Sequence, residues 1–390
     1  MICKMNSRER VNKTFRHEEP DKVPLDFGGN QSSIHIKAYK RLLEFLDIED
    51  QNIKFADFVQ QIADPCEEVL RRFNTDIRYV RPKGGMIRID EIEPQYEGKY
   101  VGVYDQFGVF WGNDAQKSID EILYYDPVIH PLTDFKTVQE INNFNWPDGT
   151  DKTPFMGLRK RAKSLFENTE YTLSAHPSGC VYEYTTFLFG FTKALRYLRT
   201  KPELIKAAME NLLIYWIDYN TTFLDEIGDY LDIISINGDL AEQAGPIMNL
   251  NVYEEMIKPI EFKLSQKVHE LADVYVNYHC CGSIPMFIPH FSEIGYDAVN
   301  PVQISAYDME PCSLKKRFGK QITFWGALCN SQKTLPFGTI KQIKDEVKYN
   351  MKCLKPGGGF IASSIHNITA EVPPENIVTM FDAANEYGNY

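Results

Sequence analysis

The chain has 390 residues, of which 43% are hydrophobic and 25% are charged, and its formal net charge is -12 at pH 7. This ordinary globular composition can bury a large core, and the acidic balance argues against a broad nucleic-acid-binding surface. No apolar run approaches the roughly 20 residues that span a bilayer, and the polar N-terminus lacks the apolar stretch of a secretory signal. We therefore expect a cytoplasmic protein that binds neither nucleic acid nor a membrane.

Eight short runs of β-branched and aromatic residues recur along the chain, bounded by turn residues such as Gly, Pro, Asn and Asp. Apolar runs of this length are typical of buried parallel strands. They cover residues 22–29, 75–82, 171–179, 231–239, 273–283, 297–303, 321–328 and 358–367.

Helical patterns separate these runs, and several end in Gly, which tolerates the left-handed conformation of a helix C-cap. Strands that alternate with helices predict βαβ units, and eight units favour an α/β fold of the (β/α)₈ TIM-barrel type with an N-terminal helical extension. The open, doubly wound alternative is weaker, because VPLDFGGNQSS at the first strand lacks G-x-G-x-x-G. The helical patterns cover residues 34–48, 64–74, 156–168, 184–228, 251–272, 284–295, 308–319, 339–359 and 373–388.

Residues 84–125 interrupt the alternation with two strand-like stretches, MIRIDEIEP and YVGVYDQFGVFWGN. Their period-two pattern around a turn predicts a β-hairpin insertion, covering about residues 84–150 and continuing into the Pro-containing loop NFNWPDG. We expect this insertion to cover part of the barrel mouth. Since no low-complexity linker occurs, we expect one domain over residues 1–390.

Eight cysteines occur along the chain. In a large cytosolic protein, thiols are more often free, buried or metal-bound than paired. We therefore expect unpaired cysteines, of which only Cys280 and Cys281 stand beside a histidine.

The segment Tyr278 to Ser283, with sequence YHCCGS, holds the strongest candidate for a functional site. Alternate side chains of a strand share one face, so His279 and Cys281 point the same way and Cys280 points the other way. Cys329 follows a later strand at the same barrel mouth. One imidazole and two thiolates suit zinc, and three protein ligands leave one position open for catalysis. The alternative is a hydrogen-bonded histidine beside ordinary buried cysteines.

Other polar residues lie at or near strand ends, where barrel enzymes gather their functional groups. Glu183 is either a fourth zinc ligand or a first-turn helix carboxylate favoured by the helix dipole. His366 is either a general acid that contacts substrate or a cap for its loop. Asp239 is a catalytic candidate, with loop ordering as its alternative. Candidate substrate contacts are Gln243, His176, Asn237 and Gln303.

Several blocks of the chain resemble the uroporphyrinogen-decarboxylase superfamily, in the right order and over essentially the whole length. The blocks are residues 5–29, 237–249, 278–284, 295–303, 324–339 and 356–377. The resemblance implies either of two chemistries: decarboxylation of a tetrapyrrole without a cofactor, or zinc-dependent methyl transfer between a corrinoid protein and a thiol.

The two chemistries differ in their motifs. The decarboxylases bind substrate carboxylates with an N-terminal R-Q-A-G-R segment, and the corresponding stretch here, LDFGGNQSSIHIKAY, lacks those arginines. The methyltransferases have H-x-C and a later Cys on zinc, which His279, Cys281 and Cys329 match. His366 matches the late histidine of the decarboxylase pattern, so the resemblance is not wholly one-sided.

The resemblance and the residues together predict a zinc-dependent methyltransferase that moves a methyl group between a corrinoid protein and a thiol or another small acceptor or donor. Zn²⁺ and methylcobalamin are the implied cofactors, and the partner protein carries the corrinoid. The first alternative is a metal-free decarboxylase or lyase that acts on a non-porphyrin acid. The second is a catalytically degenerate barrel that only binds a ligand. Zinc content separates the first two hypotheses.

Overall fold

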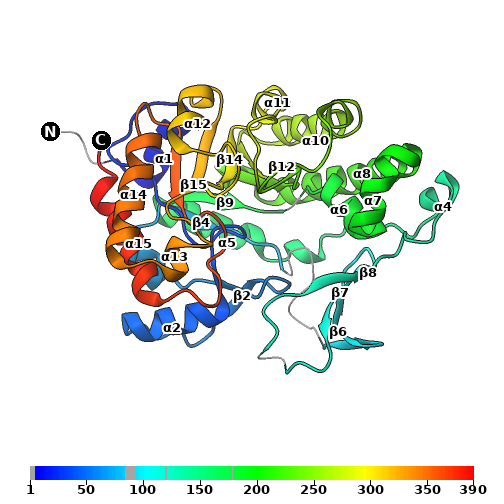
Figure 1. Cartoon of the computed structure of the whole chain (residues 1–390), viewed down its shortest axis with the longest axis horizontal. Helices are drawn as coiled ribbons and strands as arrows, with labels where there is room; N and C mark the ends of the chain where they lie inside the picture. Colours follow the sequence, from blue (N-terminus) through cyan, green and yellow to red (C-terminus); the bar gives the residue numbers. More distant parts are fainter. Residues whose placement is uncertain (1–4, 84–92, 119–120, 178) are drawn as a thin grey trace.

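The computed structural model describes residues 5–83, 93–118, 121–177 and 179–390. A parallel sheet with strand order β16-β15-β14-β13-β10-β9-β4 forms its centre (Figure 1). The strands are β4 (Ile77–Tyr79), β9 (Thr172–Ala175), β10 (Ile233–Asn237), β13 (Tyr275–His279), β14 (Ala298–Val302), β15 (Thr323–Ala327) and β16 (Phe360–Ser363).

The segment around Leu25 joins the two edges of this sheet. Leu25 forms a parallel bridge with Ala362 of β16. Its carbonyl oxygen accepts a hydrogen bond from the backbone N–H of Asp76, which precedes β4, at 2.8 Å. All eight predicted strand runs therefore belong to one closed barrel, and the (β/α)₈ prediction is confirmed.

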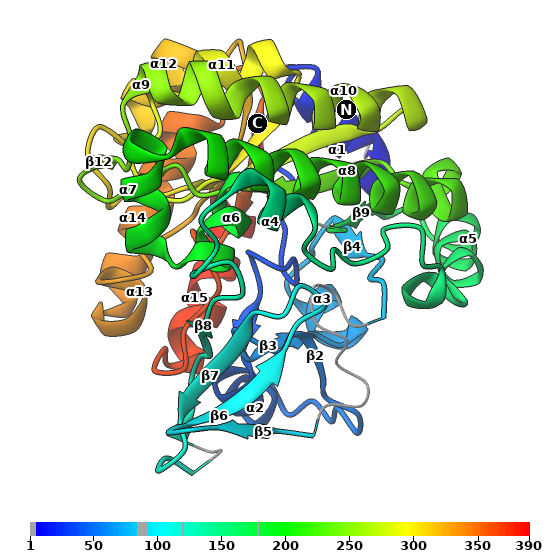
Figure 2. The same cartoon turned by 90° about the vertical axis from the view of Figure 1, so that its right-hand side faces the viewer.

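Helices surround the outside of the barrel (Figures 1 and 2). None of them, within the described residues, is long and apolar enough to cross a membrane. The longer ones are α2 (Ile36–Leu46), α3 (Glu67–Arg72), α5 (Leu158–Asn168), α6 (Tyr182–Phe189), α7 (Phe191–Thr200), α8 (Pro202–Ile227), α10 (Lys258–Leu271), α11 (Ile288–Ile294), α12 (Pro311–Phe318), α14 (Ile340–Leu354) and α15 (Pro374–Tyr387).

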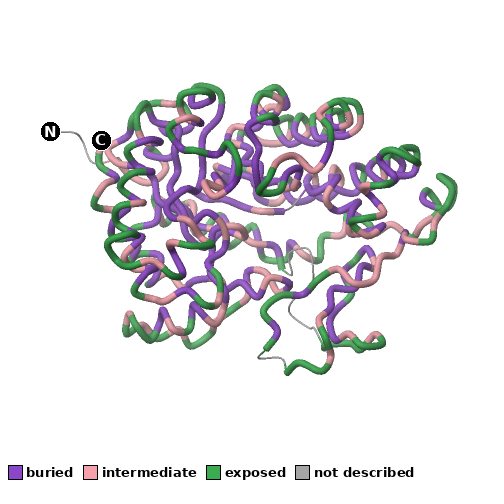
Figure 3. The backbone as a smooth tube through the Cα atoms, viewed as in Figure 1, coloured by how far each residue is buried: buried purple, intermediate pink, exposed green. Residues whose placement is uncertain are grey.

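Helix α14 shows why these helices form where the sequence predicts them. Thr339 and Gln342 form a capping box, in which each side chain accepts a hydrogen bond from the other residue's backbone N–H. One face is buried and the opposite face is exposed, as Figure 3 shows for the outer helices in general. The buried residues recur at helical spacing: Ile343, Val347, Asn350, Met351, Cys353 and Leu354.

The N-terminal extension, α1 (Ser7–Phe15), plugs the amino end of the barrel. Val11 and Phe15 of this helix pack in one buried cluster with side chains of five strands. The strand residues of this cluster are Ile77, Ile233, Ala298, Trp325 and Ile361. Apolar side chains therefore fill the barrel interior at its amino end, whereas polar side chains line a cavity toward the carboxyl ends of the strands.

The insertion is a four-stranded antiparallel sheet rather than a single hairpin. YVGVYDQFGVFWGN forms the predicted hairpin as β6 (Tyr100–Tyr104) and β7 (Phe110–Asp114), and β5 (Gln95–Glu97) and β8 (Asp126–Ile129) flank it. The predicted strand in MIRIDEIEP falls mostly on residues 84–92, which lie outside the described residues. Figure 2 shows the sheet on the side of the barrel away from α8 and α10.

One buried carboxylate, that of Asp105, fastens this sheet to the barrel. At the β6–β7 turn it accepts hydrogen bonds from the backbone N–H groups of Phe107 (2.9 Å) and Val109 (3.0 Å) and from Trp111 Nε1 (2.7 Å). The hydroxyl of Tyr184 on α6 donates to the same carboxylate. Burial raises the pKa of Asp105, and the four donors oppose that rise.

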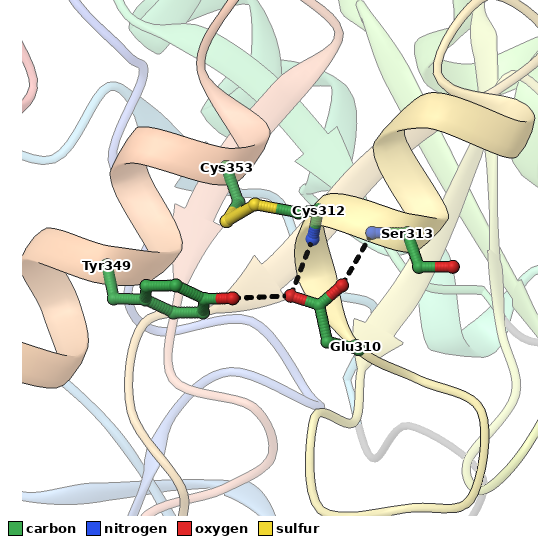
Figure 4. The surroundings of a disulfide bond; sticks show 5 residues. All are labelled: Glu310, Cys312, Ser313, Tyr349 and Cys353. Carbon is green, nitrogen blue, oxygen red and sulfur yellow. Dashed lines mark hydrogen bonds between the residues drawn. A yellow bond between two sulfur atoms is a disulfide. The ribbon is translucent and has the colours of Figure 1, made fainter.

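The expectation that the cysteines are unpaired is wrong for Cys312 and Cys353, which form a disulfide between α12 and α14 (Figure 4). The two helices lie side by side on the outside of the barrel and bring the two Cα atoms to 4.5 Å, within the range of disulfides. A separation of 41 residues gives no sequence signal for this proximity. Next to it, Glu310 caps α12 and accepts a hydrogen bond from the Tyr349 hydroxyl.

Candidate metal centre

Strand β13 and the turn after it position His279 and Cys281. Their side chains share the inner face of the barrel, with Cys281 Sγ 3.4 Å from His279 Nε2. Gly282 follows at φ +91°, and a Cβ atom there would lie 2.6 Å from the carbonyl oxygen of Glu242. The chain can therefore turn tightly past this neighbouring loop only with glycine at position 282. Cys280 faces away, as predicted, and its Sγ accepts from the backbone N–H of Leu240.

His366, in the loop after β16, is the third member of this group. Among the described residues, the ligand atoms of His279, Cys281 and His366 all lie within 4.8 Å of one another. The two imidazole rings have their centroids 5.6 Å apart. His279 is buried whereas Cys281 and His366 are half-buried, so the group is partly open to solvent.

Cys329, the predicted third ligand, does not join this group. Its Sγ lies 3.7 Å from Glu346 Oε2 of α14. The reason is the backbone at the end of β15, where Gly326 (φ +128°) and Ala327 (φ +60°) leave the extended conformation. The change of direction places the Cys329 side chain against α14.

Two half-buried carboxyl groups, those of Glu183 and Asp239, lie behind the group. Asp239 Oδ1 accepts a hydrogen bond from the backbone N–H of Cys281 at 2.8 Å. Glu183 Oε2 accepts from Cys180 Sγ (3.1 Å) and from Asn237 Nδ2 (3.4 Å). Burial, with the charge of Asp239, raises the pKa of Glu183 to about 8, so Glu183 is mostly protonated at neutral pH.

The four predicted substrate contacts take different positions. His176 Nε2 lies 2.9 Å from Asn237 Oδ1, and both residues remain at the barrel mouth. Gln303 Oε1 accepts from the backbone N–H of Gly282 at 2.8 Å and so braces the turn after Cys281. Gln243 is exposed, and its carbonyl oxygen accepts from the backbone N–H of Tyr307.

Asn300 of β14 also contacts the candidate site, and the sequence analysis did not single it out. Its Nδ2 donates to the carbonyl oxygen of Trp325 (3.4 Å), so its Oδ1 faces His279 Nδ1 as an acceptor at 2.7 Å. His279 Nδ1 therefore carries the proton, and Nε2 presents a lone pair beside Cys281. Burial lowers the pKa values of both His279 and His366 to about 4, so both rings are neutral at pH 7.

The family model of uroporphyrinogen decarboxylase (URO-D) matches residues 178–387, more than half of the chain. The chain belongs to the URO-D family. A solved structure with the same fold is a methyltransferase from Methanosarcina mazei, with a TM-score of 0.63 and 13% sequence identity over 98% of this chain and 99% of the other. No curated protein matches the sequence.

In this member of the URO-D family, the first strand segment, next to Leu25, carries a buried acid. Asp26 accepts hydrogen bonds from Tyr79 Oη (3.0 Å), Ser32 Oγ (2.6 Å) and Trp325 Nε1 (2.9 Å). Burial raises its pKa to about 6, while the three donors and the charge of Arg81 oppose that rise.

If the group holds zinc, Asn300→Leu should weaken zinc binding by about 10- to 100-fold, the usual cost of losing a residue that orients a metal ligand. The substitution removes the acceptor that fixes the tautomer of His279. Asn300→Asp keeps an acceptor of similar size and serves as the matched variant. Competition with a chromophoric chelator measures the affinity, and unchanged affinity in Asn300→Leu would contradict this role.

Proposed function

We propose that this chain is a zinc-dependent methyltransferase, which moves a methyl group between a corrinoid carried by a partner protein and a thiol or another small molecule. The observation that carries the proposal is the convergence of His279, Cys281 and His366 at the carboxyl end of the barrel. We propose His366, in place of Cys329, as the third metal ligand.

The donor set fits zinc. Two neutral imidazoles and one thiol are borderline-to-soft ligands that zinc prefers, and a tetrahedral ion held by three protein ligands keeps one position free. When bound, zinc would hold a thiol substrate in its nucleophilic thiolate form or would polarise a methyl donor. The half-buried side chains of Cys281 and His366 leave this free position a route to solvent.

The residues around the group hold it in place. The acceptor Oδ1 of Asn300 keeps the Nε2 lone pair of His279 available, and the Asp239 carboxylate fixes the backbone of Cys281. Glu183, mostly protonated, keeps a second negative charge away from the substrate side. Fixed outer-shell partners of this kind raise both the affinity and the geometric precision of a metal site.

The lyase alternative has no comparable support. A decarboxylase needs cationic or strong donor groups for its acidic substrate. Arg81, the arginine at the end of β4, already donates to Asp64 Oδ1 at 2.6 Å and to the carbonyl oxygen of Gly28. Conversion of uroporphyrinogen to coproporphyrinogen by the purified protein would nevertheless favour this alternative over methyl transfer.

The test is a spectral assay with zinc-loaded protein, methylcobalamin and a panel of small thiols. We expect thiol-dependent demethylation of the corrinoid, with the Cys281→Ser variant at the background rate. Cys280→Ser is the matched control and should keep its activity, because Cys280 faces away from the group. The reverse reaction is assayed with cob(I)alamin and candidate methyl donors. Absence of methyl transfer in both directions would contradict the proposal.

A further inference from the structure

The barrel interior next to the metal centre is polar. The inward-facing side chains one step below the ends of β10 and β13 are Ser235 and Asn277, which pair in register and are both buried. The interior of a (β/α)₈ barrel is ordinarily filled by Val, Ile and Leu. Burial of polar groups is costly unless they are hydrogen-bonded. A polar layer at this depth therefore suggests that it contacts a ligand.

This layer encloses a cavity of about 20 Å³. That volume holds one group of the size of a water molecule. His279 forms part of the wall, so the cavity adjoins the proposed metal centre. The lining residues that matter here are Gln31, Ser235, Asn277 and His279.

Two buried oxygen atoms of the lining have no hydrogen-bond partner in the described part of the chain: Asn277 Oδ1 and Gln31 Oε1. The Asn277 side chain is oriented by its Nδ2, which donates to Ser235 Oγ at 3.1 Å. Asn277 is only 5% exposed, so solvent does not satisfy its oxygen. Both unpartnered atoms are hydrogen-bond acceptors. A ligand group that donates hydrogen bonds would therefore satisfy them.

The charges around the cavity favour a cation. Asp26 lies directly behind the wall, because the three side chains that donate to it, those of Ser32, Tyr79 and Trp325, also line the cavity. No lysine or arginine is among the described residues that line the cavity. Arg81, the cation whose charge acts on Asp26, already donates to Asp64 Oδ1 at 2.6 Å and to the carbonyl oxygen of Gly28.

We propose that this cavity binds the ammonium head group of a small, amine-bearing substrate whose reacting atom lies at the metal centre. The head group donates to Asn277 Oδ1 and Gln31 Oε1, and the buried acid behind the wall balances its charge. An ammonium group has three donors and the size of a water molecule, which matches the cavity. The identity of the reacting atom rests on the proposed function, whereas recognition of the ammonium group does not.

The first test measures binding of three thiols to the zinc-loaded protein by calorimetry. The probes share the thiol and differ in the head group: 2-aminoethanethiol, ethanethiol and 3-mercaptopropionate. We expect 2-aminoethanethiol to bind at least about tenfold more tightly than ethanethiol, which is about the effect of one charge-assisted hydrogen bond. The carboxylate probe should bind most weakly. Equal binding of all three, or preference for the carboxylate, would overturn the proposal.

Variants assign the preference to the cavity. Asn277→Leu and Gln31→Leu should each reduce the preference for the ammonium probe and leave the zinc content unchanged. Thr323→Val is the matched control, because Thr323 Oγ1 is also buried and without a partner in the described structure but does not line the cavity. An undiminished preference in folded Asn277→Leu or Gln31→Leu would contradict the proposal, and so would an equal loss in Thr323→Val.

The second test removes the metal. Ethylammonium and propionate are titrated into the zinc-free Cys281→Ser variant, which has no thiol-binding metal. We expect ethylammonium alone to bind and Asn277→Leu to abolish its binding. This result would support the subsite even if methyl transfer failed, so the two proposals can fail separately. Stronger binding of propionate, or no ethylammonium binding, would contradict the subsite.

Discussion

Zinc should be lost from the Cys281→Ser and His366→Gln variants and retained by Cys280→Ser and Cys329→Ser. Each of the first two substitutions removes one of the three proposed protein ligands. Loss of an outer-shell partner already costs about 10- to 100-fold in affinity, so loss of a ligand should cost at least about 100-fold. Cys280 Sγ bonds to the loop at Leu240 and Cys329 Sγ to Glu346, so neither change touches the metal.

Metal analysis after exhaustive dialysis against a weak chelator measures this effect. His176→Gln is the matched control for the histidine, because His176 lies at the same barrel mouth and bonds to Asn237 instead. Loss of zinc from Cys329→Ser with retention in His366→Gln would reverse the assignment of the third ligand.

The pH dependence of the zinc affinity gives an independent count of the thiol ligands, because each thiol that binds zinc releases one proton. Burial and the nearby carboxylate of Asp239 raise the pKa of Cys281 well above its usual value, so the free thiol is protonated at neutral pH. The histidines release no proton above about pH 5, because their pKa values are lowered to about 4. Zinc affinity should therefore rise about tenfold per pH unit through neutrality, since one proton leaves per zinc. A site with two such thiols would give about a hundredfold rise.

Asp105→Ala should lower the free energy of unfolding by about 3–5 kcal/mol. The substitution leaves four buried donors without their acceptor: the backbone N–H groups of Phe107 and Val109, Trp111 Nε1 and the Tyr184 hydroxyl. It also detaches the antiparallel sheet from α6, the helix that carries Glu183. We therefore expect weaker zinc binding in the same variant.

Urea unfolding monitored by tryptophan fluorescence measures the loss of stability. Asp126→Ala is the matched control, because Asp126 is an exposed aspartate of the same sheet. Its free energy of unfolding should change by less than about 0.5 kcal/mol. A similar small change for Asp105→Ala would show that its four hydrogen bonds do not fasten the sheet.

The barrel could be predicted because each strand and helix has a recognisable pattern in its own local sequence. The eight apolar runs and the capped, amphipathic α14 carry their own signals, and neither depends on a distant partner. Two features depend on tertiary contacts: the disulfide, which the sequence analysis missed, and the insertion, for which it predicted too few strands. The Cys312–Cys353 bond joins helices that only the closed barrel brings together, and β5 and β8 become strands by pairing with the predicted hairpin.

The site was predictable where it follows strand alternation and not where it follows loop geometry. Alternation on β13 correctly separated His279 and Cys281 from Cys280. The position of Cys329 depends on the positive φ angles of Gly326 and Ala327, which sequence spacing does not reveal. Strand alternation places Asn300 on the inner face of β14. Its contact with His279, however, depends on the pairing of β14 with β13, which the sequence pattern does not reveal.

X-ray absorption spectroscopy of the zinc-loaded protein tests the central claim most directly, because it counts the sulfur and nitrogen atoms bound to zinc. With His279, Cys281 and His366 as ligands, the spectrum should show one sulfur at about 2.3 Å and two imidazole nitrogens at about 2.0–2.1 Å. Addition of a thiol that binds the metal should raise the sulfur count by one. Two sulfur atoms before thiol addition, with only one imidazole, would contradict the account and place Cys329 on the metal.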